Sequence, residues 1–179
     1  MEITHRELGF LNFYRASELH GGLVLGQLAR RTRDAALFVD LARHSAEETQ
    51  HALLWAETII AVGGKVQPVR ETYQTRYARI IGTPTGLLDV LALTQVFERR
   101  VYRHFTNHFR TPGTHPRVRA TLERMLEEEK DHLRWVKRWL DRQALVRGAV
   151  VAETLDRYRA ADAIVYAELT SALDWSVAA

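Results

Sequence analysis

The sequence repeats one arrangement of acids and imidazoles. Glu48-Thr49-Gln50-His51 and Glu129-Lys130-Asp131-His132 each place a histidine three residues after a glutamate. A lone glutamate precedes each pattern at nearly equal distance, because Glu18 lies 30 residues before Glu48 and Glu98 lies 31 residues before Glu129. A helical bundle can hold two metal ions with one Glu from each of two helices and Glu-x-x-His from each of two others. The spacing therefore predicts a dinuclear metal site formed by Glu18, Glu48, His51, Glu98, Glu129 and His132.

The spacing within each pattern suits metal binding. Residues three apart share one face of a helix, so Glu48 and His51 can reach a common centre. Carboxylates directed into an apolar core are costly unless they are paired, and the inward-facing positions offer almost no Arg or Lys, with Arg15 the nearest candidate. Four carboxylates balance two divalent ions, and mixed Glu and His ligation suits Fe(II), Mn(II) or Zn(II). The alternative is a chance placement of these residues on an amphipathic bundle.

Apolar residues recur at helical spacing along most of the chain. Thr4 to Glu7 form a capping box, Gly63-Gly64 end a helix, and Thr83-Pro84 begin another. A third Glu-x-x-His, at residues 2–5, spans a helix cap and heads no apolar stripe, so it is not counted as a site. We expect helices at about 4–31, 34–62, 84–110, 115–146 and 149–173, and a crossover at 65–83 that is extended or contains a short helix.

The order of these elements predicts an all-α fold. Two antiparallel helix pairs joined by a long crossover form a four-helix bundle whose topology differs from a simple up-down-up-down bundle. We expect the fifth helix to pack across the bundle or against a second subunit. The length of 179 residues suits one domain, residues 1–179. We expect a homodimer.

The composition excludes several classes. The chain has no cysteine, which excludes disulfides, thiolate metal sites and a rubredoxin-type iron centre. No run reaches about 18 apolar residues, and no signal peptide is recognisable, so we expect a cytoplasmic protein without membrane insertion. The net charge is +3, and the arginines are scattered between acids, so we expect no nucleic-acid partner.

The segments around both motifs resemble the ferritin-like superfamily, specifically its rubrerythrin-like branch. Residues 41–52 (LARHSAEETQHA), running on to Gly63-Gly64, are similar to the second helix of that family, and residues 126–133 (LEEEKDHL) are similar to the fourth. The resemblance covers about residues 4–145. It implies a ferritin-like bundle with a non-haem di-iron centre that reacts with dioxygen or peroxide. It also implies ligand roles: Glu18 and His51 terminal on one metal, Glu98 and His132 terminal on the other, and Glu48 and Glu129 bridging.

The chain departs from related families at three points. Rubrerythrins carry a four-cysteine rubredoxin domain, so electrons would come from a separate donor here. They also carry an extra carboxylate near the third-helix ligand, where Gln95 and Val101 flank Glu98. Bacterioferritins bind haem through a methionine where Thr49 stands, so we expect no haem.

Several functions share this ligand set. The first expectation is a di-iron oxidoreductase, with Mn/Fe or Zn as other metal contents. The alternatives are a substrate oxygenase of the demethoxyubiquinone-hydroxylase or aldehyde-deformylating type, a ferroxidase in an iron-storage cage, and a non-catalytic metal-stabilised bundle.

Polar residues next to the ligands are candidates for supporting roles. Metal-bound histidines commonly donate their other N–H to a carboxylate, so Glu47 would serve His132 and Glu128 would serve His51. A solvated acidic face is the alternative for both glutamates. His44 precedes Glu48 by one turn and is a ligand or a hydrogen-bonded core histidine.

Aromatic residues and glycines also lie near the ligands. Tyr14 and Tyr102 could bond ligand carboxylates or quench oxidants, and Trp55 and Trp135 could also quench; ordinary core packing is the alternative for all four. Gly21-Gly22 either open space beside the metals or allow close helix packing.

Overall fold

A computed structural model describes residues 2–172 of the chain, with side chains described up to residue 169. The fold is all-α, as predicted, and no strand occurs within the described residues. The helices are α1 (His5–Arg31), α2 (Ala35–Ala61), α3 (Tyr73–Ile81), α4 (Leu87–Arg110) and α5 (Pro116–Ala172). The chain forms two compact units: unit 1 comprises Met1–Gln74 and Gly113–Thr121, and unit 2 comprises Thr75–Pro112 and the chain from Leu122 onward.

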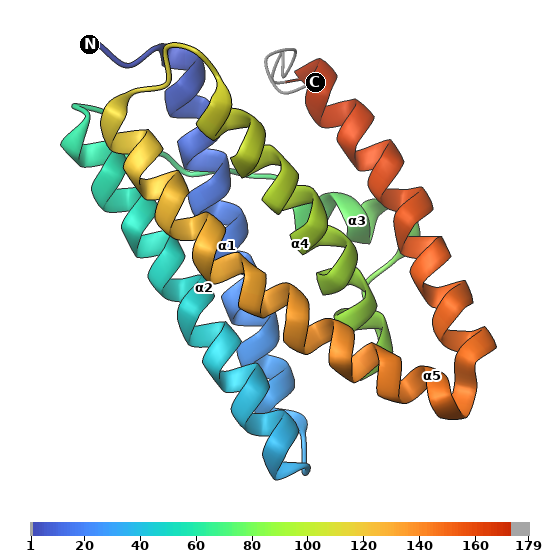
Figure 1. The fold of residues 1–179 in the computed structure, drawn as a ribbon. Coiled ribbons are helices and arrows are strands. Elements are labelled where there is room, and N and C mark those ends of the chain that lie inside the picture. The colour runs from blue at the N-terminus through green and yellow to red at the C-terminus, as the bar shows by residue number, and fades with distance from the viewer. Residues whose placement is uncertain (1, 173–179) are drawn as a thin grey trace. The chain divides into compact units, whose positions relative to one another are not determined.

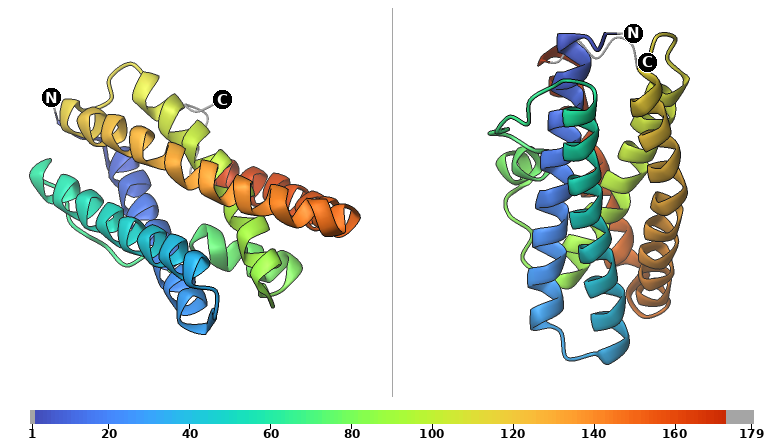
Figure 2. Two further views of the ribbon diagram at one scale, coloured as in Figure 1. Left: turned by 60° about the horizontal axis from the view of Figure 1, so that its bottom comes forward. Right: turned by 90° about the vertical axis from the view of Figure 1, so that its left-hand side faces the viewer.

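Unit 1 is built on the antiparallel pair α1 and α2, which lie side by side along their length (Figures 1 and 2). Both helices begin at side-chain caps. Thr4 Oγ1 accepts a hydrogen bond from the Glu7 amide at 3.1 Å, and Asp34 Oδ1 accepts one from the Leu37 amide at 3.0 Å. These caps satisfy amides that have no partner within the helix. A turn of only three residues, 32–34, keeps the two helices adjacent.

The two helices of unit 1 approach closely at Gly22. A Cβ added there would lie 2.8 Å from Thr49 Oγ1 and 3.0 Å from the backbone oxygen of Ser45. The Ser45 hydroxyl donates a hydrogen bond to the Gly22 carbonyl at 2.7 Å, which ties α2 to α1 at this point. Close helix packing, one of the two explanations for the glycine pair, therefore applies to Gly22.

The segment between α2 and α3 follows α1. Gly63, with φ of 81°, ends α2 in a conformation that favours glycine. The Asn12 side chain donates to the Lys65 carbonyl at 3.2 Å and accepts from the Gln67 amide at 2.7 Å. The His20 ring is hydrogen-bonded to Thr72 Oγ1 at 2.8 Å. The crossover is thus fastened along α1, and α3 is the short helix at its end.

Unit 2 contains α4 and most of α5. Arg147 has non-helical backbone angles (φ −142°, ψ 51°), which divide α5 into a first segment, 116–146, and a second segment, 148–172. The direction of α5 reverses between its orange and red parts (Figure 1). The sequence placed the boundary between its fourth and fifth helices at Arg147-Gly148. Within residues 2–172, no helix combines the length and the hydropathy that crossing a lipid bilayer requires.

Charged and aromatic contacts fasten the second segment of α5 parallel to α4. Arg157 forms an ion pair with Asp89, and the rings of His104 and Tyr166 are 5.3 Å apart. Three elements meet at one buried carboxylate, whose partners are a phenol and a guanidinium. Asp162 accepts a hydrogen bond from the Tyr77 hydroxyl of α3 at 2.6 Å and one from Arg100 Nε of α4 at 3.0 Å.

Candidate metal centre

Unit 1 presents four candidate ligands, two glutamates and two histidines, on two helices. His44, Glu48 and His51 of α2 are spaced by four and three residues, so they share one face of the helix. Their exposures are 1%, 1% and 0%, and that of Glu18 on α1 is 3%. The same face of α2 carries Leu41 and Trp55, both fully buried, so apolar packing places these polar side chains in the interior.

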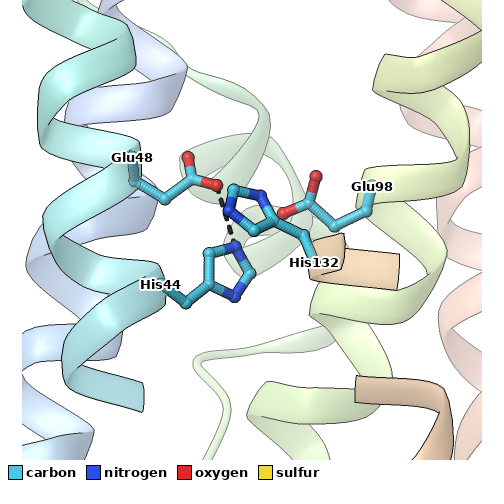
Figure 3. Close-up of side chains that lie close together, drawn as sticks. All are labelled: His44, Glu48, Glu98 and His132. Atoms are coloured by element: carbon cyan, nitrogen blue, oxygen red, sulfur yellow. Dashed lines mark hydrogen bonds and ion pairs between the residues drawn. The ribbon is translucent and has the colours of Figure 1, made fainter. Parts of the chain in front are cut away.

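The polar groups of unit 1 contact one another. His44 Nε2 and Glu48 Oε1 are joined by a hydrogen bond of 2.9 Å (Figure 3). His51 Nδ1 on α2 lies 3.8 Å from Glu18 Oε2 on α1. A ligand atom of Glu48 also lies within 4.8 Å of one of His51. Unit 1 therefore brings together the lone glutamate and the Glu-x-x-His motif of the first half of the chain.

Unit 2 repeats this arrangement with its own residues. Glu98 on α4 is 2% exposed, and Glu129 and His132 on α5 are 0% and 1% exposed. His132 Nδ1 lies 3.2 Å from Glu129 Oε2. Ligand atoms of Glu98 and His132 lie within 4.8 Å of each other, and Figure 3 shows the two side chains close together. Glu98 thus lies near His132 in unit 2, just as Glu18 lies near His51 in unit 1.

These separations suit a metal ion. Two atoms bound at about 2.1 Å to one ion lie about 3.0 Å apart at a right angle and about 3.4 Å apart in a tetrahedron. The 3.2 Å between His132 and Glu129 falls in that range, and the 3.8 Å between His51 and Glu18 needs only a small side-chain adjustment. Oxygen and nitrogen donors of this kind bind Fe, Mn or Zn. These buried Glu and His groups could therefore hold a metal ion.

The burial of the acids sets an electrostatic requirement. Moving an ionised carboxylate out of water costs several kcal/mol even after the protein relaxes. The buried titratable side chains of residues 2–169 are acids, histidines and tyrosines, and no Lys or Arg is among them. Positive charge can come from protonated imidazoles or from bound cations, and two divalent ions match four carboxylates in number of charges.

The predicted aromatic neighbours differ in their surroundings. Tyr14 is buried, with its ring 5.3 Å from that of Trp55. Burial, and secondarily the charge of Glu7, raises the pKa of Tyr14, so its phenol stays protonated and can act as a donor. Tyr102 is partly exposed, whereas Trp55 and Trp135 are buried. Their roles toward the ligands stay predictions.

The two glutamates that precede the ligand glutamates are partly exposed. Glu128 accepts a hydrogen bond from Arg124 Nε at 2.9 Å on the same helix, a contact typical of a solvated helix face. The assignments of Glu47 to His132 and of Glu128 to His51 stay predictions. His44 is a hydrogen-bonded buried histidine, and its bond to Glu48 shows how it can orient that carboxylate.

Gly21 and Gly22 differ in the atoms that an added side chain would contact. A Cβ at Gly21 would lie 3.2 Å from Glu48 Oε2 and 3.6 Å from Gln74 Nε2. Gly21 therefore leaves room beside the Glu48 carboxylate, whereas Gly22 allows close helix packing. Sequence reasoning did not single out Gln74, because it lies at the end of the crossover, where no periodic pattern marks it.

Comparison of the chain with protein-family models, with curated proteins and with solved structures finds no match.

Proposed function

We propose that Glu18, Glu48, His51, Glu98, Glu129 and His132 hold two metal ions, and that the chain is a non-haem dinuclear oxidoreductase of the ferritin-like, rubrerythrin-like kind. One observation carries the proposal. In each unit, the histidine of a buried Glu-x-x-His motif lies near the lone glutamate of another long helix, at His51 with Glu18 and at His132 with Glu98. A chance placement of acids would not be expected to repeat in this way.

The proposed reaction follows from the ligand set. Two bound iron ions would supply electrons that reduce dioxygen or peroxide, and a separate donor would restore them. The carboxylates and imidazoles of the chain would hold the ions, and the carboxylates would neutralise their charge. Their low exposure, between 0% and 3%, keeps bulk water from these side chains. His44 would orient Glu48 through their hydrogen bond, and Tyr14, whose phenol stays protonated, would act as a donor.

Anaerobic titration with Fe(II) tests the metal site. The wild-type protein should bind two ions per chain, and His51→Asn and His132→Asn should each lose at least one tight site. His5→Asn is the matched control, because His5 belongs to the third Glu-x-x-His, whose Glu2 and His5 are exposed. Equal iron binding by all four proteins would refute the proposed ligands.

Addition of dioxygen to the iron-loaded protein tests the reaction. We expect oxygen consumption on an oxygen electrode together with new near-ultraviolet absorption, both lost in the two ligand variants. Binding of two ions without any oxygen or peroxide consumption would identify a metal-stabilised bundle instead. A native mass of many subunits would favour iron storage, and the predicted homodimer would oppose it.

A further inference from the structure

Unit 2 contains a cavity of about 500 Å³ that the proposed metal chemistry does not use. Its walls come from α4 and from both segments of α5. This volume falls within the range of about 300–1,000 Å³ that is typical of small-molecule sites. The cavity is therefore large enough for a metabolite-sized ligand.

The cavity wall carries an excess of positive charge. Five cationic side chains line it (Arg99, Arg100, Arg103, Lys137 and Arg159), together with two acids, Asp141 and Asp162. The acids are already engaged, because Asp162 pairs with Arg100 and Asp141 pairs with Lys137. Three arginines remain as the source of the net charge.

Two of these arginines are available to a ligand. The side chains of Arg99 and Arg103 form no hydrogen bond or ion pair with any residue between 2 and 169. They are exposed and lie four residues apart, so they project from one face of α4. Arg159 pairs with Asp156, which is not part of the cavity wall, at 2.7 Å. Two free guanidinium groups beside a third match a dianion better than a single negative charge.

The aliphatic part of the wall is mostly buried. Val96 and Leu140 are 7% and 4% exposed, and Leu155 is half-buried. Exposed arginines and buried aliphatic side chains therefore give the cavity a charged rim and an apolar floor. Gln95 also lines the cavity at 5% exposure, and its side-chain oxygen accepts no hydrogen bond from the described residues. A buried acceptor of this kind is normally satisfied, so a ligand or water is its natural partner.

We propose that this cavity binds a small molecule that carries a phosphate monoester on an apolar body. The phosphate contacts Arg99 and Arg103 at the rim, and the apolar body covers Val96 and Leu140. The Gln95 oxygen accepts a hydrogen bond from a polar group on that body. The site lies within unit 2 and requires no bound metal, so it stands or falls independently of the proposed oxidoreductase.

Isothermal titration calorimetry with phenyl phosphate tests the site in the full-length protein. We expect saturable binding that weakens by about tenfold or more in the double variant Arg99→Gln/Arg103→Gln, since hydrogen bonds to charged groups are individually strong. The double variant Arg138→Gln/Arg142→Gln is the matched control. It removes the same charge from exposed arginines that do not line the cavity, and its affinity should stay within about twofold of the wild type.

Two other probes measure separately how the charge and the apolar body of the ligand contribute to its affinity. Inorganic phosphate, which lacks the apolar body, and benzoate, which carries one charge, should both bind more weakly than phenyl phosphate. Absence of phenyl phosphate binding at millimolar concentration would overturn the proposal, as would equal weakening by the control variant. Benzoate binding as tightly as phenyl phosphate would overturn the assignment of a dianion.

Discussion

Replacement of Gly22 by alanine tests how closely α1 and α2 must approach. The added Cβ would lie 3.0 Å from the Ser45 carbonyl, a backbone atom that cannot move unless α2 moves. It would also lie 2.8 Å from Thr49 Oγ1, which donates a hydrogen bond to the same carbonyl at 2.9 Å. Relief of the contact therefore requires either separation of the helices or loss of that hydrogen bond.

The magnitude follows from three opposing contributions. Alanine is favoured over glycine in a helix interior by about 1 kcal/mol. Overpacking a close contact costs about 1–3 kcal/mol, and the lost hydrogen bond of Thr49 adds about 1 kcal/mol. Gly22→Ala should therefore lower the free energy of unfolding by about 1–3 kcal/mol. Gly9→Ala on the same helix should raise it by about 0.5–1 kcal/mol, because nothing lies within 4 Å of the added atom.

Urea denaturation followed by circular dichroism measures both free energies. The comparison of the two variants removes the shared effect of helix propensity and leaves the effect of contact with α2. If Gly22→Ala is as stable as Gly9→Ala, the close approach of the helices does not limit unit 1 and the reasoning is wrong.

Three further predictions concern the metal site, the response to acid and the buried carboxylate of unit 2. Gly21→Ala places an atom 3.2 Å from Glu48 Oε2, which is the end of a side chain and can move. The free energy of unfolding should therefore change by less than about 1 kcal/mol, while the affinity for Fe(II) falls. Unchanged affinity in an anaerobic titration would count against the role of Glu48. Burial lowers the pKa of His104 to about 3, so below the unfolded value of about 6.5 the unfolded chain binds more protons and stability falls as the pH drops from 6.5 toward 3. His104→Phe should remove this contribution. Between pH 7 and pH 5, the free energy of unfolding of the variant should therefore fall by about 2 kcal/mol less than that of the wild type in urea titrations. Equal decreases in the two proteins would contradict the assignment. Tyr77→Phe removes the hydrogen bond to Asp162 and should cost about 1.5–3 kcal/mol by the same assay, whereas a cost below about 0.5 kcal/mol would show that water replaces the phenol.

The features of the fold that could be predicted from sequence are those that depend on residues close together in the chain. The caps at Thr4 and Asp34 mark the starts of α1 and α2 because a cap is made by residues only three positions apart. The all-α class follows from the helical period of the apolar residues, which also indicated that the candidate ligands face inward. The ferritin-like topology and the di-iron chemistry stay predictions.

Contacts between distant residues could not be predicted in this way. The Asn12 side chain forms hydrogen bonds with a segment of the crossover more than 50 residues away. Nothing in the sequence around Asn12 predicts these bonds. The meeting of Tyr77 and Arg100 at Asp162, and the cavity beside it, depend on which helix faces pack together. Burial of the candidate ligand residues was expected, but the hydrogen bond of His44 to Glu48 was one of two alternatives that spacing alone left open.

The break at Arg147 restricts how the length of the chain can change. The reversal of α5 takes place around a single non-helical residue, so no loop is available to absorb an inserted or deleted residue. One extra residue between the break and Asp162 would rotate everything beyond it by about 100° about the helix axis. Asp162 and Tyr166 would then turn away from their partners on α4. Homologous chains should therefore vary in length in the crossover or at the termini, and keep a constant number of residues from Arg147 to Tyr166.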